Sequence, residues 1–126
     1  MTAFKLLVRF RIAANLALAG YLLWAPERLA KMLLIEVPND PAFMHALAIA
    51  YVFLALAYLP SAISPRTCMA NNLFVLLGPI VPVILLLVIG WSSPALMWLA
   101  AYELAFAVAL NVGFRRGYVA ELMTKP

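Results

Sequence analysis

The sequence predicts an all-α membrane protein, a single domain over residues 1–126 that forms an antiparallel bundle of four transmembrane helices. Of the 126 residues, 67% are hydrophobic and only 11% are charged, whereas a soluble domain is about half apolar and about a quarter charged. The apolar residues also gather in four stretches, each near the length of about 20 residues that a helix needs to cross a bilayer. These stretches are continuous rather than alternating, which favours helices over the strands of a membrane barrel.

The four predicted spans are residues 4–24, 42–59, 73–90 and 95–114. Asp40-Pro41 and Ser93-Pro94 each place a capping side chain before a proline, which is typical of a helix start. Gly78, Pro79 and Pro82 are expected to bend the third span, because proline removes a backbone hydrogen bond.

The segment "APERLAKMLLIEVPND" between the first two spans is expected to contain a short interfacial helix. Glu27 and Lys31 are four residues apart, and Leu29, Met32 and Leu33 share one helical face. Such a pattern is typical of a helix that lies on a membrane surface. An irregular loop is the alternative.

The basic residues predict the orientation of the bundle. Seven of the nine lysines and arginines lie at the N-terminus, in the loop around Arg66 or in the C-terminal tail, and only Arg28 and Lys31 lie on the other side. Because positive charges stay in the cytoplasm, both termini should be cytoplasmic. The net charge of +4 is therefore explained by the excess of basic residues on the cytoplasmic side. The sequence has no basic pattern suited to binding nucleic acid.

Polar residues at similar depths on three spans predict a buried cluster. Glu103 lies eight residues into the fourth span, and Asn15 and Tyr51 fall at nearly the same depth on the first and second spans. Arg11 lies about one turn closer to the termini. An unpaired charge in hydrocarbon costs about 2.5–3.5 kcal/mol on insertion scales, so Glu103 must be paired or protonated. Two roles are open for this carboxylate. Glu103 either joins helices through hydrogen bonds, or it carries protons or binds a ligand.

His45 is the only histidine, one turn into the second span. A single histidine cannot form a two-histidine metal or haem site, so no metal is expected. An interfacial role is the default, and contact with a quinone head group is the alternative.

The fourth span carries small residues at every fourth position, Ala101, Ala105, Ala109 and Gly113. Small residues at this spacing allow close helix packing in lipid. Because they lie nearly opposite the Glu103 sector, we expect this face to dock another subunit or a second copy of the chain.

The layout resembles that of small bacterial four-helix membrane proteins of the DoxX-like kind. The stretches that carry the resemblance are "APERL", "PNDPAFMHALAIAYVFLALAYLP" and "SPR". The resemblance implies a four-helix bundle in the bacterial inner membrane and, in some relatives, partnership with a quinone-linked membrane oxidoreductase.

No nucleophile–base pair, phosphate loop or pair of carboxylates is present, so the chain is not expected to be an enzyme acting alone. Three functions remain open. The first is a non-catalytic subunit of a larger membrane complex, such as an electron-transfer or photosynthetic assembly. The second is a quinone-associated redox subunit, and the third is a small proton-coupled transporter that uses Glu103. No cofactor is expected beyond a bound quinone or lipid, and the partners are lipid and other membrane subunits.

Overall fold

The computed structural model describes residues 1–33, 41–89 and 93–124, and this part of the chain is helical with no strand. The all-α prediction is therefore confirmed. The helices, in chain order, are α1 (Thr2–Trp24), α2 (Pro26–Leu33), α3 (Pro41–Ala57), α4 (Leu59–Ile63), α5 (Met69–Leu77), α6 (Ile80–Ile89) and α7 (Pro94–Thr124).

Three segments of the described chain are long and apolar enough to cross a membrane: Thr2–Trp24, Met69–Val88 and Pro94–Thr124. Helix α3 is equally apolar but has 17 residues, which corresponds to about 25 Å. The backbone N–H of Tyr58 donates to Leu54 and that of Ala62 donates to Tyr58. These bonds connect α3 to the short α4, so the apolar helical segment extends about one turn beyond the end of α3.

The expected bend in the third apolar stretch is confirmed, since α5 ends at Leu77 and α6 begins at Ile80. Pro79 has no N–H to donate to the preceding turn. The side-chain amide of Asn111 on α7 donates to the carbonyl of Leu76 at 3.3 Å, beside the break. A Cβ added to Gly78 would lie 2.6 Å from the carbonyl oxygen of Phe74, so the bend leaves no room for a side chain.

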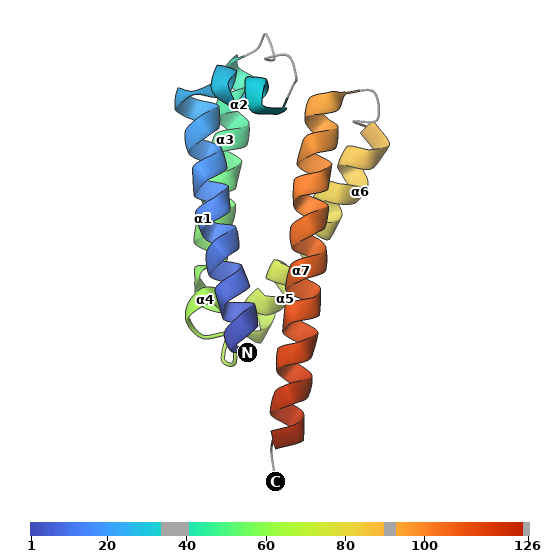
Figure 1. The fold of residues 1–126 in the computed structure, drawn as a ribbon. Helices are drawn as coiled ribbons and strands as arrows, with labels where there is room; N and C mark the ends of the chain where they lie inside the picture. The colour runs from blue at the N-terminus through green and yellow to red at the C-terminus, as the bar shows by residue number, and fades with distance from the viewer. Residues whose placement is uncertain (34–40, 90–92, 125–126) are drawn as a thin grey trace.

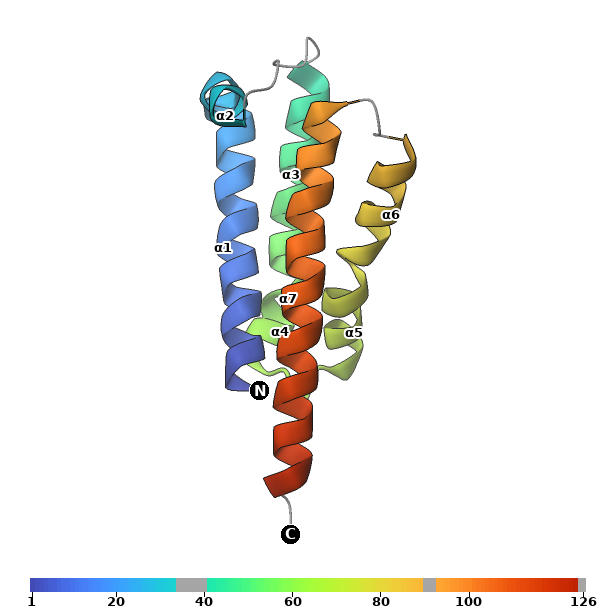
Figure 2. The ribbon, with the colours of Figure 1, turned by 45° about the vertical axis from the view of Figure 1, so that its right-hand side comes forward.

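The helices form two pairs, α1 with α3 and α6 with α7, and the pairs meet where α7 packs against α1 (Figures 1 and 2). Both termini lie at the same end of the bundle, and α2 lies at the other end (Figure 1). We call these two regions the terminal half and the α2 half. The core of the terminal half contains Phe4, Val8, Tyr58, Ala62, Val75, Leu76, Phe106 and Leu110. The core of the α2 half contains Ala19, Leu22, Met44, Ala48 and Tyr51.

Two helices refine the sequence-based boundaries. A helix does form at Pro26–Leu33, with Glu27 in its first turn and Lys31 in its last. Helix α7 continues to Thr124, ten residues past the predicted end of the fourth span at residue 114. The apolar run stops at Arg115 and Arg116, but Ala120, Glu121, Leu122 and Met123 are good helix formers, and the helix continues through Gly117 to reach them.

Candidate functional site

A buried ion pair joins α1 to α7 near the middle of the bundle. Nη2 of Arg11 donates to Oε2 of Glu103 at 2.5 Å, and the two side chains are 0% and 3% exposed. Both charged groups are buried away from solvent. The free-energy cost of this desolvation is offset only when the two charges pair in good geometry. Removing either partner would leave the other charge buried and unpaired.

A third helix holds the same carboxylate. The hydroxyl of Tyr51 on α3 donates to Oε1 of Glu103 at 3.1 Å. Both oxygens of Glu103 are therefore hydrogen-bonded, one to α1 and one to α3. The three elements meet through a single side chain.

The Arg11 guanidinium also lies over two aromatic rings of α7. Its central carbon is 4.7 Å from the ring centroid of Tyr102 and 4.5 Å from that of Phe106. Its Nε and Nη1 atoms have no hydrogen-bond partner among the described residues. Cation–π attraction over these faces partly replaces the missing hydrogen bonds, and it strengthens in a site without water.

Asn15, which lies at nearly the same depth as Glu103, hydrogen-bonds Tyr102 rather than Glu103. Its Oδ1 accepts a hydrogen bond from the hydroxyl of Tyr102 at 2.8 Å. Asn15 thus reaches the Arg11–Glu103 pair through Tyr102, which the sequence analysis did not single out. The sequence could have indicated this contact. Arg11 and Asn15 share one face of α1, and the facing stretch of α7 includes Tyr102 and Phe106 as well as Glu103.

A second polar group closes the turn between α4 and α5. Oδ1 of Asn71 accepts from the backbone N–H and the hydroxyl of Ser61, and its amide nitrogen donates to the carbonyl of Ala57 at 2.7 Å. These bonds satisfy the last carbonyl of α3 and hold α5 against the end of α3 and against α4. The role of Asn71 is structural, and no periodic pattern in the sequence indicated it.

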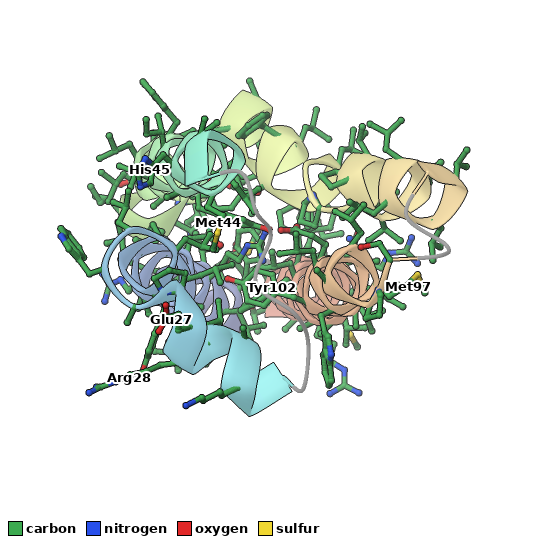
Figure 3. The ribbon with its side chains drawn as sticks, turned by 90° about the horizontal axis from the view of Figure 1, so that it is seen from above. Glu27, Arg28, Met44, His45, Met97 and Tyr102 are labelled. Carbon is green, nitrogen blue, oxygen red and sulfur yellow. The ribbon has the colours of Figure 1, made fainter. Side chains whose placement is uncertain are left out.

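An apolar cavity of about 510 Å³ occupies the α2 half, between α1, α2, α3 and α7. In the view along the bundle, Met44 and Tyr102 point into the space between these helices (Figure 3). The residues that line the cavity are Leu18, Tyr21, Leu22, Pro26, Leu29, Ala30, Met44, Leu47, Ala95, Leu96, Trp98, Leu99, Ala101 and Tyr102.

His45 does not line this cavity, so the alternative of a ligand contact has no support from the cavity, and the default interfacial role stays a prediction. Its side chain is exposed and points away from the bundle centre (Figure 3). Consecutive residues on a helix differ by about 100°, so turning Met44 inward turns His45 outward.

The small residues of α7 do not form one outward face. Ala101 borders the cavity and Ala105 is exposed, whereas Gly113 is buried. A Cβ on Gly113 would lie 2.6 Å from Cδ1 of Leu7 on α1, so Gly113 belongs to internal packing. Each step of four residues turns the helix by about 40° beyond a full turn. After the three steps from Ala101 to Gly113, the small residue therefore faces the bundle interior instead of the outside.

The described residues contain no group of three or more His, Cys, Asp or Glu side chains placed to hold a metal ion. Comparison of the chain with protein-family models, with curated proteins and with solved structures finds no match. The resemblance to the DoxX-like proteins therefore stays a prediction. What the chain's own geometry offers is a closed ionic junction next to an apolar cavity.

Proposed function

We propose that this protein is a non-catalytic, four-span subunit of a larger membrane assembly, with both termini on the cytoplasmic side of a bacterial inner membrane. The observation that carries the proposal is the closed state of the Arg11–Glu103 pair. These are the two buried charged side chains in the described part of the chain, and each has the other as its partner. A carboxylate that holds an arginine and a tyrosine on two other helices serves as a junction between helices.

The length of α7 supports a partner outside the bundle. Its 31 residues extend over about 46 Å, whereas the hydrocarbon core of a bilayer is about 30 Å thick. Its last turns project past the N-terminus of α1 (Figures 1 and 2). Val119, Leu122 and Met123 on this extension are 52%, 52% and 82% exposed, an apolar face suited to a neighbouring subunit.

The experiment is mild detergent extraction of the tagged protein, followed by identification of co-purifying membrane proteins. We expect a defined set of partners that the Leu122→Gln/Met123→Gln variant loses while its helical content stays unchanged. Thr124→Gln, an exposed change on the same extension, is the matched control and should keep the partners. A variant that retains every partner would remove the extension from the proposal, and a chain that purifies alone would contradict the subunit function.

The membrane topology is tested separately with reporters of sidedness at both termini, near Arg66 and in the segment 34–40. We expect cytoplasmic signals from the first three sites and an external signal from the last. An external terminus would overturn the orientation inferred from the basic residues.

A quinone-associated subunit is the second candidate, because the apolar cavity falls in the size range of about 300–1,000 Å³ that is typical of small-molecule sites. The third candidate, a proton-coupled transporter, depends on Glu103 releasing its proton, yet Glu103 is already paired with Arg11. An Arg11→Gln/Glu103→Gln variant distinguishes the transporter from the non-catalytic subunit, since it removes both charges together. It should retain partners if the pair is a junction, and it should abolish transport if Glu103 carries protons.

A further inference from the structure

The apolar cavity begins at the end of the bundle and extends inward along the helices. Its lining includes Pro26, the first residue of α2, and Ala95 at the start of α7. Leu18 on α1 and Tyr102 on α7 also line it, eight and seven residues further in. At a rise of 1.5 Å per residue the cavity therefore follows the helices for about 10 Å. This is the direction in which lipid chains run beside a membrane helix.

Water is a poor occupant of this space. The lining contributes two tyrosine hydroxyls and otherwise apolar groups, apart from the indole of Trp98. A buried water needs about three hydrogen bonds, and even a cavity of about 150 Å³ lined by apolar side chains stays dry or binds an apolar molecule. A space of about 510 Å³ left empty would forfeit the van der Waals contacts of its walls.

The cavity is open on the side where α1 and α7 separate. Tyr21 on α1 is 40% exposed and Trp98 on α7 is 49% exposed, and both line the cavity. Tyrosine and tryptophan favour the level of the lipid head groups. A hydrocarbon chain whose head group stays at that level can enter between them without crossing a polar barrier.

The inner end of the cavity, at Leu18 and Tyr102, offers no free hydrogen-bond donor to a polar ring. The Nδ2 atom of Asn15 has no partner among the described residues, but Asn15 does not line the cavity. Tyr102 supplies the hydroxyl at this end, and it already donates its proton to Asn15 at 2.8 Å. A ring carbonyl placed there would have no hydroxyl proton to accept. A methyl-terminated chain requires none.

We propose that this cavity holds one acyl chain of a membrane phospholipid, which remains bound as a structural lipid between the two helix pairs. The lipid fills the apolar space between α1, α2, α3 and α7, beside the contacts that Tyr102 of α7 makes with Asn15 and Tyr51. The inference rests on the proposed membrane-spanning bundle, and its test separates the two.

The test uses the full chain reconstituted in nanodiscs of equal parts dioleoyl phosphatidylcholine and dioleoyl phosphatidylglycerol. Native mass spectrometry after mild delipidation then counts the phospholipids that stay bound. We expect one retained phospholipid for the unmodified chain. Ala101→Phe, which adds a ring at the cavity wall, should lower this occupancy at least tenfold.

Ala105→Phe is the matched control, because Ala105 lies one turn further along α7, is exposed and does not line the cavity. It should retain the phospholipid. Should Ala101→Phe fail to fold, Ala95→Phe fills the cavity from its end and should give the same loss.

Equal retention in the cavity-filling variants and the control would overturn the proposal, as would an isoprenoid lipid instead of a phospholipid in protein purified from native membranes. If the chain does not integrate into the bilayer, the proposed function is contradicted. If the chain integrates but retains no phospholipid, only the lipid-binding inference is contradicted.

Discussion

The terminal half and the α2 half share the apolar helices α1 and α7 but are packed differently. In the terminal half, Phe4 and Phe114 meet edge to face with centroids 5.1 Å apart, and Val8 and Leu110 have no exposed surface. In the α2 half the same two helices diverge around the cavity that Leu22 lines. Lipid is as apolar as leucine, so apolar composition alone does not close a bundle. Specific contacts close it, and these contacts are concentrated at one end.

The Arg11–Glu103 pair lies at the boundary between the two halves. It fixes α1, α3 and α7 at one level through the bonds to Arg11 and Tyr51. Below this level the aromatic core packs closely, and above it the helices are free to separate. The difference between the halves can be tested by substitutions that act mainly on one of them.

The largest effect is expected from breaking the ion pair. Arg11→Met or Glu103→Leu alone leaves an uncompensated buried charge and should lower the free energy of unfolding by about 3–5 kcal/mol. The double variant Arg11→Met/Glu103→Leu removes both charges and should recover most of that loss. Unfolding by denaturing detergent measures all three. A double variant as unstable as the worse single variant would show that the pair is not the junction.

A matched pair of leucines compares the two cores directly. Leu110 is 0% exposed in the terminal half, and Leu22 is 7% exposed beside the cavity. Leu110→Ala should cost about 2–5 kcal/mol, and Leu22→Ala should cost less than half as much, because fewer atoms surround it. Both values come from the same unfolding assay. Equal costs would mean that the α2 half is as well packed as the terminal half.

Gly78→Ala tests the bend beside the terminal core. The added Cβ would lie 2.6 Å from the carbonyl oxygen of Phe74 and 3.1 Å from the hydroxyl of Tyr58. Because a backbone atom would have to move, we expect a loss of about 1–3 kcal/mol. Gly20→Ala is the control, since its Cβ would meet only ring carbons of Trp24 at 3.7 Å or more. A neutral Gly78→Ala would show that the bend is adjustable.

The smallest effect concerns the surface of the terminal half. Arg66 donates two hydrogen bonds to Glu121, which lies on the α7 extension beyond the predicted span, and this bonding lowers the pKa of the Glu121 carboxyl below its ordinary value of 4.5. A carboxyl with a lowered pKa in the folded state stabilises the fold above its ordinary pKa, and this contribution disappears as the pH falls through the folded pKa.

Arg66→Gln should therefore lower the melting temperature slightly at pH 7 and have no effect well below pH 4, since exposed pairs contribute little. High salt should reduce the difference at pH 7. A pH-independent effect of the substitution would point to a steric cause.

The sequence alone determined the solvent, the helical class and most helix limits. Continuous apolar runs, prolines at helix starts and the Gly78-Pro79 bend are local features, so neighbouring residues suffice to predict them. The sequence also indicated that Asn15, Tyr51 and Glu103 lie at nearly one depth, with Arg11 about one turn closer to the termini, because depth follows from counting residues along each span. The described helices lie close to the predicted spans, but α5 begins at Met69, four residues before the predicted start of the third span, and α7 continues ten residues past the predicted end of the fourth.

Only the tertiary structure decided which side chains meet and where the bundle stays open. Partner choice depends on helix rotation and on the separation of helices, and neither quantity is fixed by one helix alone. The rotation paired Asn15 with Tyr102, turned His45 outward and placed Gly113 against Leu7. The cavity arises because α1 and α7 are joined at the ion pair and diverge beyond it, a property of two helices together that neither sequence segment encodes by itself.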